Sequence, residues 1–165
     1  HIVVGGTIPA LGRLREAAQA TGAKRTRLLD VRVASHTSLL NGAAQRFALA
    51  LDASGMLDPQ VTLLSGVDAS VVTKREAGRA ALSAALCRPL AWSRCMQAAW
   101  RTGHEVFLEI GPGRALSRLL RDAYPQAVVH SVEDFASLRA VADWAHKELD
   151  VKRISSEETP SLSLH

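Results

Sequence analysis

The chain has 165 residues, a formal net charge of +4 and a hydrophobic fraction of 47%. This length fits one ordinary domain, and no apolar run reaches the roughly 20 residues needed to span a bilayer. The positive charge favours acidic partners, with an ordinary solvated basic surface as the alternative. One Tyr and three Phe leave few side chains to stack on bases, which argues against nucleic acid.

The two cysteines, Cys87 and Cys95, form no CxxC motif, and no His stands at metal-ligand spacing from either. This predicts two buried free thiols in a reducing cytosol. No signal peptide is visible at the start of the sequence. We therefore expect a cytoplasmic protein that binds no metal and no cofactor.

Strand-like and helix-like segments alternate along the chain. In order, we predict a strand at 1–6, a helix at 9–22, a strand at 26–33, a helix at 40–50, a strand at 60–67, helices at 74–87 and 91–103, a strand at 105–110, a helix at 114–125, a strand at 126–132 and a helix at 134–149. The alternation predicts an α/β architecture with a largely parallel sheet. The first three segments form a predicted β-α-β unit. From residue 152 the periodicity is lost, which predicts a flexible tail at 152–165.

His36 is the leading candidate for catalysis, because His is the side chain that titrates near neutral pH and serves most often as a general base. It lies in "RVASHTSLL", where a predicted strand gives way to a helix. Judged by spacing alone, a lone His in such a loop is more often structural or surface-exposed. Ser35 adjoins it, but neighbours on an extended segment point to opposite sides, so direct activation of Ser35 is not expected.

Two further segments have a polar or glycine-rich character. The turn in "EIGPGRAL" could present backbone N–H groups to an anion, although it lacks the residues of a P-loop or a dinucleotide motif. A tight strand-to-helix turn is the simpler interpretation. The corner "GAKRTR" carries Lys24, Arg25 and Arg27, which could contact phosphates or carboxylates or could be solvated. No GxSxG nucleophile elbow is present, so the chain has no evident partner for His36.

Several of these segments, taken in series, resemble one family. "GAKR…LDVRVASHTSLL", "LLSGVDA", "CRPLAW" and "VFLEIGPGRAL" follow one another in the order and approximate spacing of malonyl-CoA:acyl-carrier-protein transacylases. The resemblance covers residues 2–149 and matches the C-terminal half of these enzymes. "ASHTSLL" and "HSVEDFASLRAVADW" look most similar to the epsilon subunit of malonate decarboxylase, a dedicated member of the group.

The resemblance implies a fold and a division of the chain. Family members have an α/β-hydrolase-like large subdomain with a small ferredoxin-like insert. Residues 1–31 would be the second half of the insert, and residues 32–151 the C-terminal part of the large subdomain. In the family, the serine of the GHSxG elbow, the arginine that binds the malonyl carboxylate and the early oxyanion-hole residues all lie upstream of the matched region.

The resemblance also assigns roles to residues. His36 matches the general acid/base that serves the upstream serine. A family Gln that offers its main-chain carbonyl to the catalytic His is replaced here by Ala85, which retains a carbonyl. A family Asn aligns near Gly66, which puts a polar contact in doubt. "VASH" does not decide between malonyl and methylmalonyl substrates, because Ser precedes the His in malonyl-selective enzymes too. Lys24 and Arg25 match a basic pair on the carrier-protein side of the cleft.

The implied function is malonyl transfer from CoA to an acyl-carrier-protein thiol, with the malonate decarboxylase carrier subunit as the expected acceptor. The expected partners are malonyl-CoA, an acyl carrier protein and an N-terminal half that carries the serine. Two alternatives remain open. One is a fatty-acid or polyketide acyltransferase of the same fold. The other is a non-catalytic fragment that only docks a carrier protein.

Overall fold

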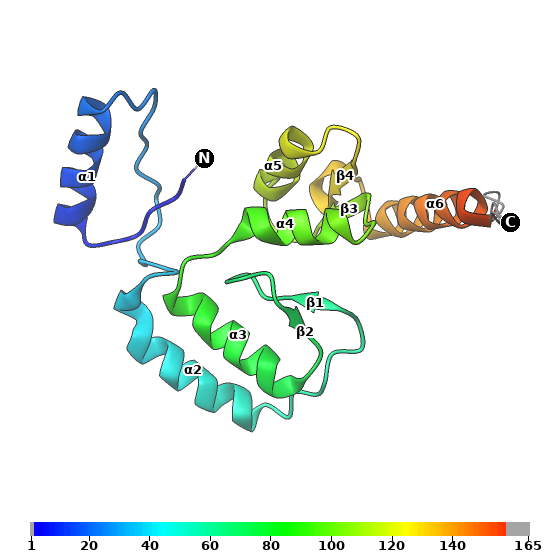
Figure 1. The fold of residues 1–165 in the computed structure, drawn as a ribbon, viewed down its shortest axis with the longest axis horizontal. Helices are drawn as coiled ribbons and strands as arrows, with labels where there is room; N and C mark the ends of the chain where they lie inside the picture. Colours follow the sequence, from blue (N-terminus) through cyan, green and yellow to red (C-terminus); the bar gives the residue numbers. More distant parts are fainter. Residues whose placement is uncertain (1, 158–165) are drawn as a thin grey trace, which may run out of the picture. The chain divides into compact units, whose positions relative to one another are not determined.

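The computed structural model of the chain describes residues 2–157, with side chains described as far as residue 150. It divides into two compact units, His1–Ala98 and Ala99–His165, which are described separately (Figure 1). Both units mix helices with short strands. The predicted mixed α/β class is therefore confirmed.

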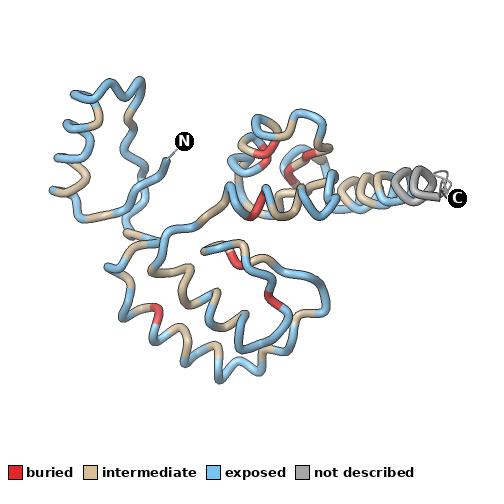
Figure 2. Tube along the Cα trace, in the orientation of Figure 1, coloured by how far each residue is buried: buried red, intermediate tan, exposed pale blue. Residues whose placement is uncertain are grey.

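The first unit is mostly helical. Its elements are α1 (Ile8–Ala20), the 3-10 helix η1 (Ser38–Leu40), α2 (Asn41–Ala53), β1 (Leu63–Leu64), β2 (Val71–Val72), α3 (Arg75–Cys87) and most of α4 (Trp92–Arg101). Helices α2 and α3 lie side by side (Figure 1). The buried side chains in this unit include Ala44 on α2 and Val72 on β2 (Figure 2). Met96 is buried on α4.

The N-terminus of α3 is held by an acidic side chain from the loop between α2 and β1. Asp58 accepts the backbone N–H of Arg75 at 2.7 Å and pairs with Lys74 at 3.0 Å. The hydrogen bond from Arg75, followed by that from Lys74, lowers the pKa of the Asp58 carboxyl. A carboxylate at this end of a helix satisfies free N–H groups and complements the helix dipole. Helix α3 is thus anchored at the end opposite to the candidate site.

The second unit contains a strand-helix-strand arrangement. Its elements are β3 (Val106–Glu109), α5 (Ala115–Ala123), β4 (Val128–Ser131), the 3-10 helix η2 (Val132–Asp134) and α6 (Leu138–Glu157). Strands β3 and β4 are parallel, with Val106 opposite Val128, and both lie within segments predicted as strands. Leu120 of α5 and Val129 of β4 are buried between these elements (Figure 2).

Several expectations about strands differ from the structure. The predicted strands at 1–6 and 26–33 are not strands in the described residues, so the predicted β-α-β unit is absent. A strand is stabilised only by pairing with a neighbour, and neither segment has one among residues 2–157. Their apolar side chains remain exposed; Ile2, for example, is 91% exposed. The prediction of one largely parallel sheet is also wrong. The described strands form two separate two-stranded sheets, and β1 and β2 pair antiparallel.

The C-terminal helix is longer than predicted. α6 continues to Glu157, so residues 152–157 are helical where the sequence analysis expected a tail. The polar composition of this stretch does not oppose a helix, because Lys, Arg and Glu are good helix formers. The rest of the predicted tail, 158–165, lies outside the described residues.

Candidate active site around His36

His36 is attached to the C-terminal turn of α3 by two hydrogen bonds. Its backbone N–H donates to Leu86 O at 2.9 Å, and its ring Nδ1 lies 2.5 Å from Ala85 O. Carbonyls in the last turn of a helix have no intrahelical donor. His36 therefore supplies donors that the end of α3 lacks, and the helix in turn fixes both the backbone and the ring of His36. The contact with Ala85 O expected from the resemblance is present.

Pro89 explains why the Ala85 carbonyl is free. In a continuing helix, Ala85 O would accept the N–H of residue 89, but proline has no N–H. Proline also disfavours helical backbone at the residue before it, and Arg88 is accordingly extended, with φ −125° and ψ 148°. The "CRPL" segment thus ends α3 and leaves two carbonyls for His36.

The Ala85 contact also sets the tautomer of the ring. A carbonyl oxygen only accepts, so Nδ1 of His36 must carry the hydrogen. In the neutral ring, Nε2 then holds the lone pair. His36 is exposed, and among residues 2–150 no side chain forms a hydrogen bond with Nε2. A ring held at Nδ1 and open at Nε2 is the arrangement of a general base.

The backbone around His36 is unusual. His36 has φ +62°, in the left-handed region that non-glycine residues seldom adopt. The expectation of a simple extended segment at Ser35 and His36 is therefore wrong. No hydrogen bond joins their side chains, and the N–H of Ser35 donates to Val33 O at 2.8 Å. Within the described part of the chain, Ser35 thus gives no sign of being the partner of His36.

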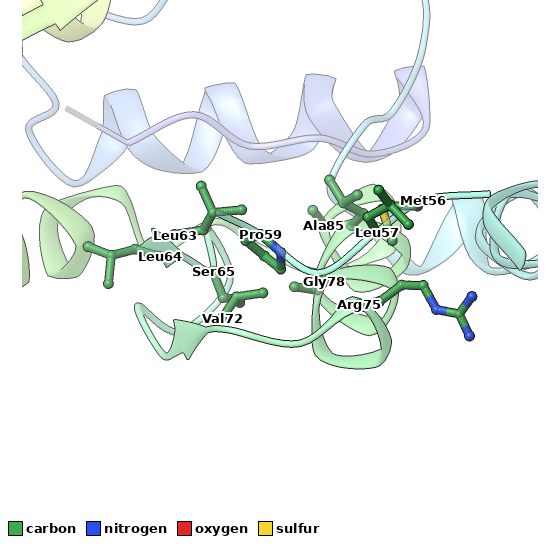
Figure 3. Close-up of a pocket in the computed structure, with 13 residues that line it drawn as sticks. Met56, Leu57, Pro59, Leu63, Leu64, Ser65, Val72, Arg75, Gly78 and Ala85 are labelled. Carbon is green, nitrogen blue, oxygen red and sulfur yellow. The ribbon is translucent and has the colours of Figure 1, made fainter. Parts of the chain in front are cut away.

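A cavity of about 280 Å³ lies beside the same helix, between α3 and the β1–β2 hairpin. Its lining is almost wholly apolar and includes Ala85, Leu82 and Val72 (Figure 3). The guanidinium of Arg75 points away from the other labelled residues and pairs with Glu76. The cavity suits an apolar occupant rather than a carboxylate.

The other residues taken from the resemblance lie in two places. Lys24 and Arg25 are exposed in the segment between α1 and η1, and neither forms an ion pair with the residues that the structure describes. Gly66, where the family has an Asn, lines the cavity, and its backbone carbonyl accepts the N–H of Ala91 at 2.8 Å. No side chain replaces the family's polar contact at that position.

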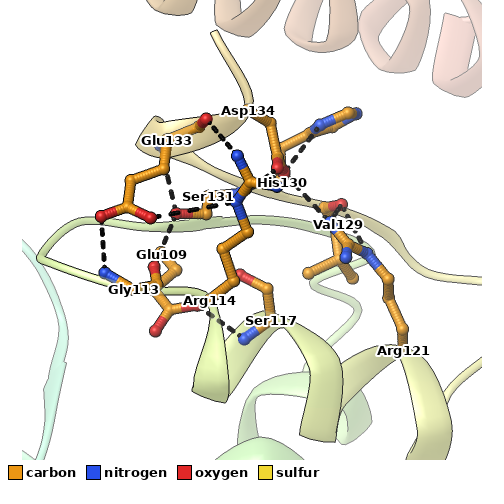
Figure 4. Close-up of polar contacts among 10 residues, drawn as sticks. All are labelled: Glu109, Gly113, Arg114, Ser117, Arg121, Val129, His130, Ser131, Glu133 and Asp134. Atoms are coloured by element: carbon orange, nitrogen blue, oxygen red, sulfur yellow. Dashed lines mark hydrogen bonds and ion pairs between the residues drawn. The ribbon is translucent and has the colours of Figure 1, made fainter.

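Carboxylates of the chain itself accept the N–H of Gly113 in the glycine turn of "EIGPGRAL" and two N–H groups at the start of α5 (Figure 4). Glu109 accepts the N–H and the hydroxyl of Ser117, at 2.8 and 2.5 Å, and the N–H of Leu116 at 3.2 Å. Glu133 accepts the N–H of Gly113 at 2.7 Å. The turn is thus a structural strand-to-helix connection, and an anion site there is not supported.

Burial raises the pKa of the Glu109 carboxyl, but the hydrogen bonds from Ser117 and Leu116 outweigh that effect and lower the pKa overall. A second carboxylate, Asp134, accepts the N–H of Ser131 and pairs with Arg114 and Arg121 at 3.2 and 3.1 Å. The Ser131 bond is the largest cause of its lowered pKa. None of these carboxylates was among the predicted site residues, although "SVED" has the spacing of the capping box that Ser131 and Asp134 form.

Cys87 is half-buried and Cys95 buried, both as free thiols, and burial raises the pKa of Cys95. Among residues 2–157, no group of three or more His, Cys, Asp or Glu side chains is arranged to hold a metal ion. Within the same residues, no helix is both long and apolar enough to cross a membrane.

No family model matches the chain. The comparisons with curated proteins and with solved structures both find malonyl transacylases. The malonyl CoA-acyl carrier protein transacylase of Haemophilus influenzae is 31% identical over 87% of this chain and 46% of its own length. The enzyme of that name from Escherichia coli is 33% identical over 73% of this chain and 39% of its own length.

A solved structure of a malonyl-transacylase in complex with its type II polyketide synthase acyl-carrier protein is 34% identical. It matches with a TM-score of 0.74 over 79% of this chain and 42% of that chain. The chain spans about half the length of the curated relatives it matches. It is a homologue of the malonyl CoA-acyl carrier protein transacylases and corresponds to their C-terminal half.

Proposed function

We propose that the chain provides the base-bearing half of a malonyl-CoA:acyl-carrier-protein transacylase, an acyltransferase. The observation that carries this proposal is the arrangement of the two ring nitrogens of His36. Ala85 O fixes the Nδ1–H tautomer, and Nε2 remains open to a reacting group. The finer subdomain assignment belongs to the same proposal, with residues 1–31 in a ferredoxin-like insert and residues 32–151 in an α/β-hydrolase-like part.

The chemistry needs a nucleophile that this chain does not contain. An upstream serine would attack the thioester carbonyl of malonyl-CoA while His36 Nε2 takes its proton. The same nitrogen would then give that proton to the departing CoA thiolate. In the second half-reaction, the carrier-protein thiol loses its proton to Nε2 and attacks the acyl-serine, and the proton returns to the serine. Throughout, the Ala85 carbonyl accepts from Nδ1 and holds the ring in place.

The direct test is an intact-mass measurement on the complete protein after brief exposure to malonyl-CoA. We expect one covalently attached malonyl group, which disappears when an acyl carrier protein is added, because transfer regenerates the free serine. Holo carrier protein without CoA substrate is the control. An unmodified protein under conditions where CoA binding is measurable would overturn the proposal and favour the docking-fragment alternative.

Within this function, we propose the malonate decarboxylase carrier subunit as the acceptor. The segments "ASHTSLL" and "HSVEDFASLRAVADW" support this choice. A fatty-acid or polyketide carrier is the alternative acceptor. The solved complex of a similar malonyl-transacylase with its polyketide synthase carrier protein supports this alternative. Rates of loading measured side by side on the three carrier classes, with malonyl-, methylmalonyl- and acetyl-CoA as donors, separate these acceptors. Preference for another carrier or donor would reject this finer assignment alone.

Charge reversal of Lys24 and Arg25 is expected to weaken carrier-protein recognition. The two exposed cations, near His36 in sequence, would attract an acidic carrier. For Lys24→Glu/Arg25→Glu we expect KM for the carrier to rise about tenfold, with hydrolysis of malonyl-CoA unchanged and the salt dependence of KM reduced. The matched control is Arg13→Glu/Arg15→Glu, which makes the same change in net charge on the exposed face of α1. Equal effects of both double variants would show that overall charge, and not this pair, matters.

A further inference from the structure

The turn that contains His36 is held by a residue to which neither the sequence analysis nor the resemblance assigns a role. Thr37 follows His36 and occupies the N-cap position of η1. At this position a Thr hydroxyl ordinarily accepts an N–H from the first turn of the helix. Here it makes no such cap. It donates instead to Ala34 O at 2.7 Å, across the two residues between them.

This hydrogen bond closes the chain around His36. Ala34 O lies before His36 and Thr37 Oγ1 after it, so the bond bridges both sides of the residue with φ +62°. A non-glycine residue leaves the left-handed region unless its surroundings hold it there. Thr37 is half-buried, which protects the bond from competition with water. The bond therefore opposes relaxation of the His36 backbone.

The N-terminal segment supports the same turn from outside. A Cβ added to Gly5 would lie 2.8 Å from Thr37 Cγ2 and 3.2 Å from Ser35 O. The segment thus approaches the turn so closely that only glycine fits without a shift. Because the Thr side chain is β-branched and stiff, the rotamer that directs its methyl group toward Gly5 is the one whose hydroxyl reaches Ala34 O.

We propose that Thr37 is a positioning residue for His36. By donating to Ala34 O, it holds the left-handed backbone that sets the His36 ring on Ala85 O and leaves Nε2 open. Its importance for the reaction rests on the proposed transacylase function. Its effect on the ring of His36 does not depend on that function, so the effect on the ring and the effect on the reaction can be measured separately.

The test compares Thr37→Val, which keeps the shape and removes the hydroxyl, with Thr37→Ser, which keeps the hydroxyl. NMR of the complete protein labelled with 15N-histidine reports the tautomer of His36, assigned by loss of its signals in His36→Gln. In Thr37→Val we expect the Nδ1–H population to fall and its exchange with water to accelerate. In Thr37→Ser both stay at the wild-type values. Thr21→Val is the matched control, because it removes a Thr hydroxyl bond to Ala17 O in the same unit.

Kinetics then measures the consequence for the reaction. For Thr37→Val we expect kcat for malonyl transfer to fall about tenfold, with KM for malonyl-CoA unchanged. For Thr37→Ser we expect kcat to stay close to the wild-type value. A change in tautomer in a protein with no transacylase activity would retain the positioning role and reject the proposed function. An unchanged His36 spectrum in folded Thr37→Val would reject the positioning role whatever the activity.

A second pair of variants keeps the test decisive if Thr37→Val does not fold. Gly5→Ala should disturb the turn through the contact with Thr37 Cγ2. Combining it with Thr37→Ser removes that methyl group while keeping the hydroxyl. We expect Gly5→Ala to reduce the Nδ1–H population and the double variant to recover most of it. Additive effects of the two changes, without recovery, would contradict the proposed coupling.

Discussion

Replacing His36 with Ala in the complete protein is expected to reduce the rate of malonyl transfer by about 10²–10⁴-fold, the usual contribution of a general acid–base group. The loss should fall on both half-reactions, because the same Nε2 would serve the serine and the carrier thiol. Pre-steady-state measurement of acyl-enzyme formation and of carrier loading checks each half separately.

His146→Ala is the matched control for this prediction. His146 is an exposed histidine on α6, and none of the described contacts involves it. We expect its loss to leave both rates unchanged. Circular dichroism melts of the two variants exclude unfolding as the cause of any difference. Near-normal transfer by folded His36→Ala would disprove the role of His36.

Replacing Glu109 with Ala is expected to lower the free energy of unfolding of the second unit by about 2 kcal/mol. The substitution removes the acceptor for two N–H groups of α5 and for the hydroxyl of Ser117, which is 2% exposed. Glu109→Gln retains an acceptor oxygen and should cost about half as much. Hydrogen exchange of the β3, α5 and β4 amides measures the loss where it occurs.

The stability of this unit should also depend on pH below the usual Glu value of 4.5. The folded-state pKa of Glu109 is lowered, so the ionised carboxylate stabilises the fold above its unfolded pKa. That contribution is lost as pH falls through the folded pKa. Glu109→Gln should remove this part of the acid transition, while the part due to Asp134, whose pKa is also lowered, remains.

Asp143→Asn serves as the control for both measurements. Asp143 is exposed on α6 and forms no ion pair with the described residues. We expect it to change neither the hydrogen exchange nor the acid transition. If Glu109→Gln and Asp143→Asn behaved alike, the bonds between Glu109 and α5 would carry no measurable stability.

Local sequence signals predicted the helices well. α3, α4 and α5 lie within the segments predicted from apolar periodicity, and α1 begins one residue before its predicted segment. All four helices end two residues before a glycine or proline, such as Gly22 or Pro125. Both strands of the parallel pair β3–β4 lie within predicted strand segments, because each is a short apolar run. The strands at 1–6 and 26–33 were not found, because strand formation depends on a partner that local composition does not reveal.

The site shows the same division between local and tertiary information. The sequence by itself determined that His36 is the candidate base and that no serine elbow accompanies it in this chain. Only the tertiary structure showed that Leu86 O holds the backbone of His36 and that Thr37 closes its turn, because these bonds depend on a left-handed φ that no residue type specifies. It also showed that Glu133 accepts the N–H of Gly113 in the glycine turn, because only the fold brings together residues that lie 20 apart in sequence.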